Sequence, residues 1–196
     1  MKLVLASSSP YRAQMLGQLH LPFDTLSPDI DETPKADEGI DDYVSRLALE
    51  KARAVAENCP NSLVIGSDQA CTLQGLILGK PADEEAARKQ LKLCSGNTVD
   101  FRTGLALINT ATGKQRTHVE HFRVRFRSLT DEEIRAYIKI DQPLDCAGCF
   151  RVEATGIVLF EALEGRDYNA LLGLPLIALA TMLREEGLNP LLIAGS

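Results

Sequence analysis

Charged side chains beside breaks between apolar segments are the residues of this sequence best suited to chemistry. They are the isolated cations Arg12, Lys51 and Lys80 and the isolated carboxylates Glu32, Asp68 and Glu153. Hydrolysis of a nucleoside triphosphate needs this mixture, because cations neutralise the phosphates while a carboxylate prepares the attacking water. Spacing along the chain does not establish that these side chains meet in space.

A serine-rich turn near the amino terminus leads to the first of these cations. Residues 3–6 are a short apolar run that predicts a buried strand, and three serines follow. Ser9 suits a helix N-cap and Pro10 the first helical position. A helix amino terminus at the end of a strand presents N–H groups and a positive dipole end, which favour an anion. Arg12, in the first helical turn, adds a group able to make two hydrogen bonds to phosphate.

Asp68 comes directly after a second apolar strand, predicted over residues 63–66 and expected to end at residues 67–69. Sites in open α/β sheets lie where strands end. A carboxylate there can bind a divalent cation or accept a proton from water. The local sequence supports a turn or capping residue equally well.

The other charged residues have weaker individual signals. Lys51 lies on a helix predicted over residues 42–57, where a solvated position is the commoner reading. Lys80 lies in a turn constrained by a flanking glycine and proline, which favours a positioned cation. Glu32 lies in an acidic segment, residues 29–41, that is expected to be a loop and in which a solvated carboxylate is the simpler reading.

Helices and strands alternate along the chain, which predicts an α/β or α+β fold with a mixed sheet. The buried face of the helix over residues 42–57 is expected to contain Leu47, Ala48, Ala52 and Val55. The other predicted elements are a hairpin at residues 74–75, a helix over 83–93, paired strands over 100–108 and 115–127, a helix opened by a capping box at 130–133, a strand over 157–160 and a helix over 175–186.

The composition is that of a globular protein long enough for one sizeable core, with 196 residues of which 45% are hydrophobic and 24% charged. The net charge of −6 argues against binding to a nucleic acid polymer, which needs a basic face. No apolar run is long enough for a signal peptide or a membrane span. A cytoplasmic location without a membrane partner is therefore expected.

Several enzyme classes lack their motifs here. The sequence contains no phosphate-binding P-loop, no dinucleotide-binding glycine fingerprint and no zinc-hydrolase histidine pair, and Ser67 is not in a serine-hydrolase elbow. Cys146 and Cys149 have redox or metal-pair spacing, but no second pair completes a zinc site, which favours a structural role. Cys71 and Cys94 are expected to be small buried hydrophobes.

Short motifs in a fixed order run along nearly the whole chain. The first is Leu-Ala-Ser-Ser-Ser-Pro-Tyr-Arg at residues 5–12. It is followed by motifs at residues 31–32, 47–52, 66–69, 79–81, 93–96, 103–104, 147–148 and 173–176. Together they resemble the Maf family of nucleotide pyrophosphatases, whose opening signature is Ser-x-Ser-Pro-Arg-Arg. The resemblance covers residues 1–196 as a single domain.

The resemblance implies an α/β fold built on an elongated, curved mixed sheet flanked by helices, with two lobes around a phosphate-binding cleft. It implies hydrolysis of the bond between the α- and β-phosphates of a nucleotide, with a divalent metal, Mg²⁺ or Mn²⁺, and a homodimer. By position, Asp68 becomes the proton acceptor for the attacking water and, with Glu32, a metal contact. The implied phosphate contacts are Arg12, Lys51 and Lys80, with Ser7 and Ser9 on the phosphate-binding turn.

Three positions bear on the nucleotide base. Tyr11, Gln69 and Glu153 resemble the subgroup of the family that acts on 7-methyl-GTP, although that subgroup usually carries tryptophan at position 11. The methylated guanine is positively charged, so an aromatic ring stacked on it gains roughly 0.5–2 kcal/mol. Glu153 is suited to accept hydrogen bonds from guanine N1 and N2. The simpler readings are packing in the first helical turn for Tyr11 and a solvated charge for Glu153.

Two alternatives remain open at this point. The first is a pyrophosphatase for other nucleotides, such as dTTP, UTP or their modified forms. The second is a nucleotide-binding regulator of cell division or septum formation with little turnover. The presence of Asp68 and the lysines favours catalysis, because a protein that only binds nucleotides has no need of a water-activating base.

Overall fold

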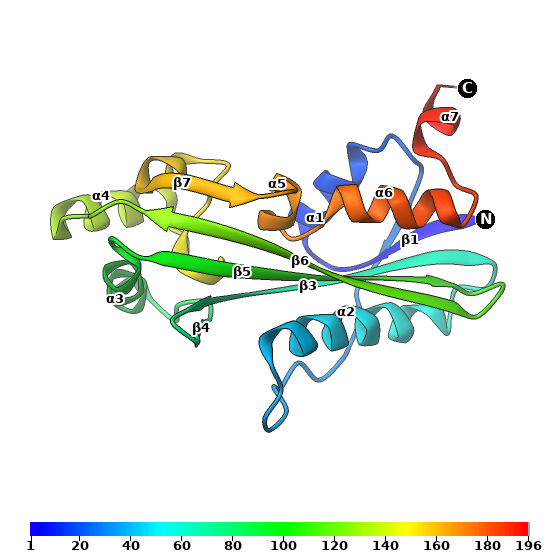
Figure 1. The fold of residues 1–196 in the computed structure, drawn as a ribbon, viewed down its shortest axis with the longest axis horizontal. Coiled ribbons are helices and arrows are strands. Elements are labelled where there is room, and N and C mark those ends of the chain that lie inside the picture. The colour runs from blue at the N-terminus through cyan, green and yellow to red at the C-terminus, as the bar shows by residue number, and fades with distance from the viewer. Residues whose placement is uncertain (196) are drawn as a thin grey trace. The chain divides into compact units, whose positions relative to one another are not determined.

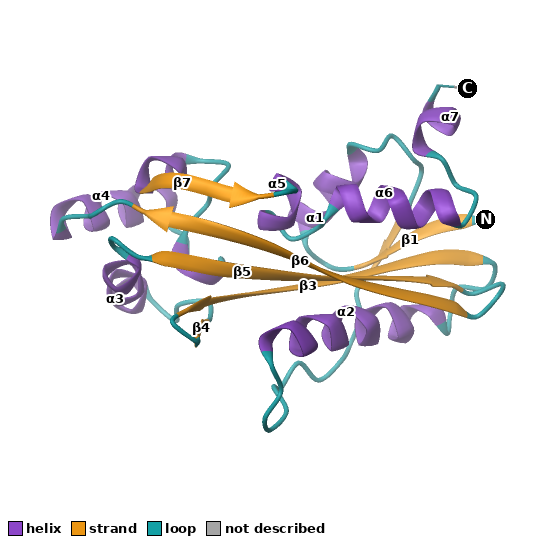
Figure 2. Cartoon of the chain, viewed as in Figure 1, coloured by secondary structure: helices purple, strands orange, loops and turns teal. Residues whose placement is uncertain are grey.

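The computed structural model describes residues 1–195, in which helices and strands alternate (Figures 1 and 2). Seven strands form a mixed sheet in the order β2-β1-β3-β5-β6-β7, with β4 paired to β3. The α/β class and the mixed sheet flanked by helices are therefore confirmed. The single domain and the two lobes around a cleft stay predictions.

The chain divides into two compact units. The first unit contains Met1–Gln69, Arg102–Glu120 and the described residues from Asp167 onward, and the second contains Ala70–Phe101 and His121–Arg166. The elements of the first unit are β1 (Lys2–Ala6), α1 (Pro10–Gly17), β2 (Asp24–Leu26), α2 (Ile40–Ala56), α5 (Tyr168–Leu171), α6 (Leu176–Glu185) and α7 (Pro190–Ala194). Three strands contribute to both units: β3 (Ser62–Leu73), β5 (Thr98–Asn109) and β6 (Lys114–Phe126). The second unit adds β4 (Leu76–Leu78), α3 (Glu84–Cys94), α4 (Asp131–Asp141), the 3₁₀ helices η1 (Ala147–Cys149) and η2 (Thr155–Leu159), and β7 (Phe160–Gly165).

In the first unit, both faces of the sheet are covered. Odd-numbered residues of the strands point to one face and even-numbered residues to the other. The residues that pack with α1 and α6 are odd-numbered: Leu3, Leu5, Leu63, Ile65, Leu105 and Leu107. The residues that pack with α2 are even-numbered: Val4, Ala6, Val64, Ala106 and Ile108. Figure 1 shows α2 and α6 on opposite sides of the strands. Because successive strand residues point to opposite faces, the same alternation along β3 assigns Ser67 to the α6 face and Asp68 to the α2 face.

The two helices nearest these strands begin and pack as the sequence predicts. Ser9 is the N-cap of α1, its hydroxyl accepts from the Arg12 backbone N–H at 3.4 Å, and Pro10 is the first helical residue. The predicted inner face of α2 is buried and consists of Leu47, Ala48, Ala52 and Val55. Both predictions are confirmed.

Two glycines let the backbone of α2 lie directly on the strands. A Cβ atom at Gly66 would overlap the carbonyl oxygen of Ala48 and lie 2.9 Å from the backbone nitrogen of Ala52. A Cβ atom at Gly104 would overlap the carbonyl oxygen of Val44. Any side chain at either position would therefore push the helix away from the sheet.

The second unit has an aromatic core. Phe150 and Phe160 pack edge to face at 4.8 Å between ring centroids, and Phe126 packs against both of them. Cys71 and Cys94 are buried and all five cysteines are free, which confirms the prediction of small buried hydrophobes. Burial raises the pKa of the Cys94 thiol to about 12. A buried thiol of this kind is a poor nucleophile.

Two local predictions in the second unit are also confirmed, the hairpin at residues 74–75 and the capping box at residues 130–133. Gln74 and Gly75, both with positive φ, connect β3 to β4, with Leu73 opposite Leu76. Thr130 and Glu133 form both hydrogen bonds of the predicted capping box.

Two predictions about strands are wrong. The strand expected to end at residues 67–69 continues to Leu73, because its ladder is extended by pairing with β4. Residues 157–159, predicted to start a strand, belong to the 3₁₀ helix η2, and β7 begins at Phe160. The Asp141 carboxylate binds the backbone N–H of Gly156 at 3.1 Å and fixes the chain in this tighter turn.

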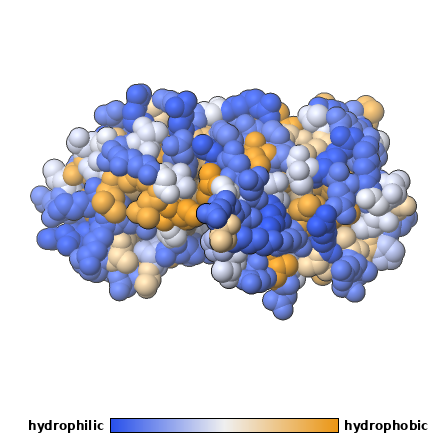
Figure 3. Space-filling model, turned by 60° about the horizontal axis from the view of Figure 1, so that its bottom comes forward, coloured by the Kyte–Doolittle hydropathy of each residue, from blue (hydrophilic) through white to orange (hydrophobic). Residues whose placement is uncertain are grey.

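Charged residues lie mainly at the surface. Figure 3 shows a largely hydrophilic face with smaller apolar patches. Among the residues that the structure describes, the buried charged side chains are Lys51, Asp68, Glu120, Asp141 and Asp167. Burying a charge is costly unless it is paired, so each of these needs a partner. The described chain contains no helix long and apolar enough to cross a membrane.

Candidate active site

A buried ion pair links α2 to β3. The Lys51 ammonium lies 2.5 Å from Oδ1 of Asp68 and 2.8 Å from Oε1 of Glu32. The side chains of Lys51 and Asp68 are only 8% and 9% exposed, whereas that of Glu32 is 56% exposed. The lysine therefore joins one buried and one open carboxylate, and an ammonium has three donors with which to hold both.

Asp68 lies just beyond the end of a neighbouring strand, although its own strand continues. β1 pairs with β3 in parallel, and its last residue, Ala6, lies opposite Gly66. Asp68 is therefore two residues past the end of β1, where the chain turns from β1 to α1. The site expected at a strand end in an open α/β sheet is thus created by β1.

The turn between β1 and α1 is held by its serines. The Ser7 hydroxyl accepts from the Ser9 backbone N–H at 3.1 Å, and Ser9 caps α1. A hydroxyl that accepts from the backbone can still donate its own hydrogen to an anion. The turn thus combines serine hydroxyls with the positive end of α1, as a phosphate site requires.

Arg12 lies within the field of both carboxylates. Burial lowers the pKa of its guanidinium, and the negative charges of Asp68 and then Glu32 oppose this shift. Its Nε donates to the carbonyl oxygen of Gly173 at 2.9 Å. This bond fixes the guanidinium through one nitrogen and leaves the two Nη atoms as further donors.

The loop between α5 and α6 supports Arg12. The buried Ser67 hydroxyl lies 2.9 Å from the Gly173 carbonyl oxygen and 2.7 Å from that of Gly104. The Asp167 carboxylate accepts from the backbone N–H of Asn169 at 2.9 Å and of Ile177 at 2.7 Å, and so ties α5 to α6. Gly173 has a φ of 102°, which favours glycine. This loop therefore presents its carbonyl to Arg12 in a fixed position.

Gln69, next to Asp68, points to the opposite face of β3. Its Nε2 lies 2.8 Å from the Ala170 carbonyl oxygen, 3.0 Å from that of Leu171 and 3.1 Å from the Thr103 hydroxyl. These contacts all use the amide nitrogen. A direct contact of Gln69 with substrate would therefore have to use the carboxamide oxygen.

The sequence matches one known family over nearly its whole length. Residues 2–186 match the family model described as Maf-like protein. The chain belongs to the Maf family. Membership of this family supports a nucleotide pyrophosphatase in general.

Two solved structures are similar to this Maf-family chain. One is a HAM1 protein from Coxiella burnetii, with 18% identity and a TM-score of 0.47 over 64% of this chain and 73% of that chain. The other is the Staphylococcus aureus Ham1 protein, with 16% identity and a TM-score of 0.47 over 64% of this chain and 72% of that chain.

The carboxylates of this site fit a divalent cation. Glu32 and Asp68 both lie against one positive charge, the Lys51 ammonium, and both offer the hard oxygen ligands that Mg²⁺ and Mn²⁺ prefer. Within residues 1–195, no group of three or more His, Cys, Asp or Glu side chains is arranged to hold a metal. Mg²⁺ is commonly held by one or two carboxylates together with substrate phosphates, so two protein carboxylates suffice.

The structure brings together four of the residues singled out in the sequence: Arg12, Glu32, Lys51 and Asp68. Ser7, Ser9 and the partly buried Tyr11 lie on the adjoining turn and the first turn of α1. Lys80 and Glu153 belong to the second unit, where both are exposed, Lys80 after β4 and Glu153 in the turn before η2. Their roles as phosphate and base contacts stay predictions.

Sequence reasoning gave no role to the residues that support the site rather than form it, although Ser67 and Gly173 stand in the ordered motifs. Ser67, Asp167 and Gly173 hold the loop behind Arg12, and Arg46 holds the segment that carries Glu32. Only Asp167 has a local signal, since an aspartate before a short helix is a typical N-cap. The others act through contacts that are distant in the sequence.

Proposed function

We propose that this protein hydrolyses the bond between the α- and β-phosphates of a modified nucleoside triphosphate, most specifically 7-methyl-GTP, to give the monophosphate and diphosphate. The proposal depends on one observation, the pairing of Lys51 with both Glu32 and Asp68, with Arg12 near enough to interact electrostatically with both carboxylates. A nucleotide-binding regulator without turnover has no need of a carboxylate buried beside a lysine. The buried Asp68 therefore favours catalysis.

Each residue of the site has a separate role in the proposed hydrolysis. Asp68 accepts a proton from the attacking water, while Arg12 and Lys51 bind the phosphates and stabilise the charge that develops on them. Ser7 and Ser9 orient a phosphate at the amino terminus of α1. Glu32 and Asp68 would hold the divalent cation, which when bound would supply further positive charge to the phosphates. The role of Lys80 as a further phosphate contact stays a prediction from the family resemblance.

The choice of 7-methyl-GTP follows from charge. The methylated base is a cation, so the Tyr11 ring attracts it through a cation–π contact and an acidic side chain such as Glu153 favours it further. A neutral pyrimidine gains neither of these charge interactions. The substrate assignment therefore depends on Tyr11 and Glu153, whereas the reaction type depends on the buried pair.

Release of diphosphate should be measured with Mg²⁺ and with Mn²⁺ for 7-methyl-GTP, GTP, UTP, CTP and dTTP. We expect the highest kcat/KM with 7-methyl-GTP. Preference for a pyrimidine nucleotide would retain the pyrophosphatase and overturn the assignment of the base. Binding without turnover of any of these nucleotides would favour the regulator.

Tyr11→Arg should reduce the preference for 7-methyl-GTP over GTP by about two- to thirtyfold, the range that corresponds to loss of a cation–π contact. The introduced guanidinium also repels the cationic base. The ratio of the two kcat/KM values is the quantity to measure, and Tyr11→Phe, which keeps the ring, is the matched control. An unchanged ratio in Tyr11→Arg would remove the ring from base recognition.

A further inference from the structure

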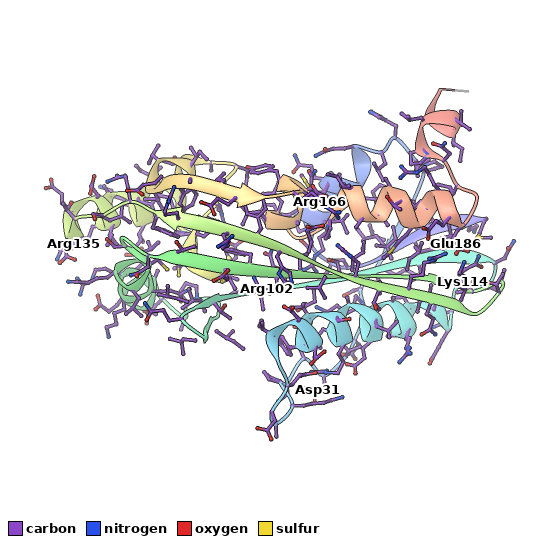
Figure 4. All side chains as sticks on the ribbon, in the orientation of Figure 1. Asp31, Arg102, Lys114, Arg135, Arg166 and Glu186 are labelled. Carbon is purple, nitrogen blue, oxygen red and sulfur yellow. The ribbon has the colours of Figure 1, made fainter. Side chains whose placement is uncertain are left out.

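The segment that carries Glu32 has no helix or strand of its own. Residues 27–39 are irregular, and Glu32 is exposed. Figure 4 shows Asp31, its neighbour, on the loop that precedes α2. The Glu32 carboxylate nevertheless reaches the Lys51 ammonium at 2.8 Å. An exposed side chain on an irregular segment keeps such a position only if the segment is anchored.

One guanidinium on α2 provides this anchor. Arg46 binds both carboxylate oxygens of Glu38, with Nε to Oε1 at 2.5 Å and Nη2 to Oε2 at 2.8 Å. Its Nη2 also donates to the Thr33 carbonyl oxygen at 3.2 Å, and its Nη1 donates to Glu50 at 3.0 Å. Arg46 therefore holds the segment at two points, at Thr33, which follows Glu32, and at Glu38.

Tyr43, one turn earlier on α2, adds a third point. Its hydroxyl donates to the Glu32 carbonyl oxygen at 3.0 Å, and the Arg46 guanidinium lies 5.6 Å from the centre of its ring. Residues three apart on a helix share a face, so both side chains reach the same segment. The backbone of residues 32 and 33 is thereby fixed to the helix that also carries Lys51.

The Arg46–Glu38 pair of this anchor is largely covered and lies in a strongly acidic part of the chain. The Arg46 and Glu38 side chains are only 15% and 9% exposed. Hydrogen bonds from Arg46 lower the pKa of Glu38 to about 2. Residues 29–42 contain seven carboxylates, Asp29, Asp31, Glu32, Asp37, Glu38, Asp41 and Asp42. Arg46 neutralises part of this negative charge beside α2, where Asp41 and Asp42 belong to the helix itself.

We propose that Arg46 is a positioning residue that keeps the Glu32 carboxylate against Lys51 and Asp68 by fixing residues 32–38 to α2. The inference builds on the proposed function, in which Glu32 takes part. Arg46 is not itself assigned to the substrate or the metal. Its effect on catalysis passes through Glu32.

The anchor can be tested without substrate. Lys35 lies in the anchored segment, and a loosened segment fits a protease more readily, so we expect Arg46→Gln to raise the initial rate of trypsin cleavage after Lys35 about tenfold, as for loss of a coupled contact. The matched control is Arg53→Gln, on the same helix, whose guanidinium binds Gln115. Cleavage after Lys35 at the same rate in Arg46→Gln and Arg53→Gln would overturn the proposal.

A double-mutant cycle tests whether Arg46 affects catalysis by positioning Glu32. We expect Arg46→Gln to lower kcat/KM about tenfold in the wild-type background and to cause no further loss in a Glu32→Gln background. Arg46→Lys, which keeps the charge, should recover part of the activity, and Arg53→Gln should match wild type. An equal loss in both backgrounds would show a general structural effect and overturn the proposal.

The two proposals fail in different ways. If the wild-type protein turned over none of the nucleotides tested, the proposed function would be overturned, while the tryptic cleavage rates would still decide whether Arg46 anchors the segment. If turnover is present and the cycle is additive, the proposed function stands and the positioning role is wrong.

Discussion

Asp68→Asn should lower kcat by at least about a hundredfold while nucleotide binding stays measurable, because the amide keeps the shape of the side chain and loses the proton acceptor. Lys51 keeps Glu32 as a partner in this variant. Single-turnover diphosphate release gives the rate, and calorimetric titration with nucleotide gives the affinity.

The matched control for this change is Asp24→Asn. Asp24 lies on the exposed edge strand β2, so the same substitution there alters charge without touching the site. We expect its kinetics to match those of the wild-type protein. A kcat within twofold of wild type in Asp68→Asn would remove Asp68 from the role of proton acceptor, whatever the substrate.

Gly66→Ala should destabilise the protein by about 1–3 kcal/mol, the usual cost of inserting a methyl group into a well-packed interior. The added Cβ meets backbone atoms of Ala48 and Ala52, which have no rotamer with which to move aside. The helix must shift instead, and it carries Lys51 with it. We therefore expect turnover to fall together with the free energy of unfolding, measured by urea denaturation.

Gly17→Ala is the control for the glycine substitution. Gly17 is the last residue of α1, and a Cβ atom there meets nothing within 4 Å. Alanine also has the higher helix propensity, so this variant should be at least as stable as wild type. If Gly66→Ala were as stable and as active as Gly17→Ala, close contact of α2 with β3 would not position Lys51.

Several elements follow from the sequence alone because they depend on contacts within a few residues. Ser9 and Pro10 start α1, Thr130 and Glu133 form a capping box, and Gln74-Gly75 turns a hairpin. The spacing of apolar residues likewise identified the buried face of α2. Each signal is a local preference of the backbone that the rest of the fold does not override.

The family could also be inferred from the sequence, because short motifs in a fixed order along the chain are specific as a set. The ordered motifs named Arg12, Glu32, Lys51 and Asp68 as members of one site. Individually, Lys51 and Glu32 read better as solvated charges. What the motifs did not provide is how the four residues are brought together.

The arrangement of these four residues depends on contacts between distant parts of the chain. Asp68 lies in the middle of a strand, and the strand end that opens the site belongs to β1. Arg12 is fixed by Gly173, 161 residues away, and Lys51 reaches Asp68 because α2 lies on Gly66 and Gly104. Strand length and helix approach are decided by pairing and packing partners that no local window of sequence contains, so only the tertiary structure could determine them.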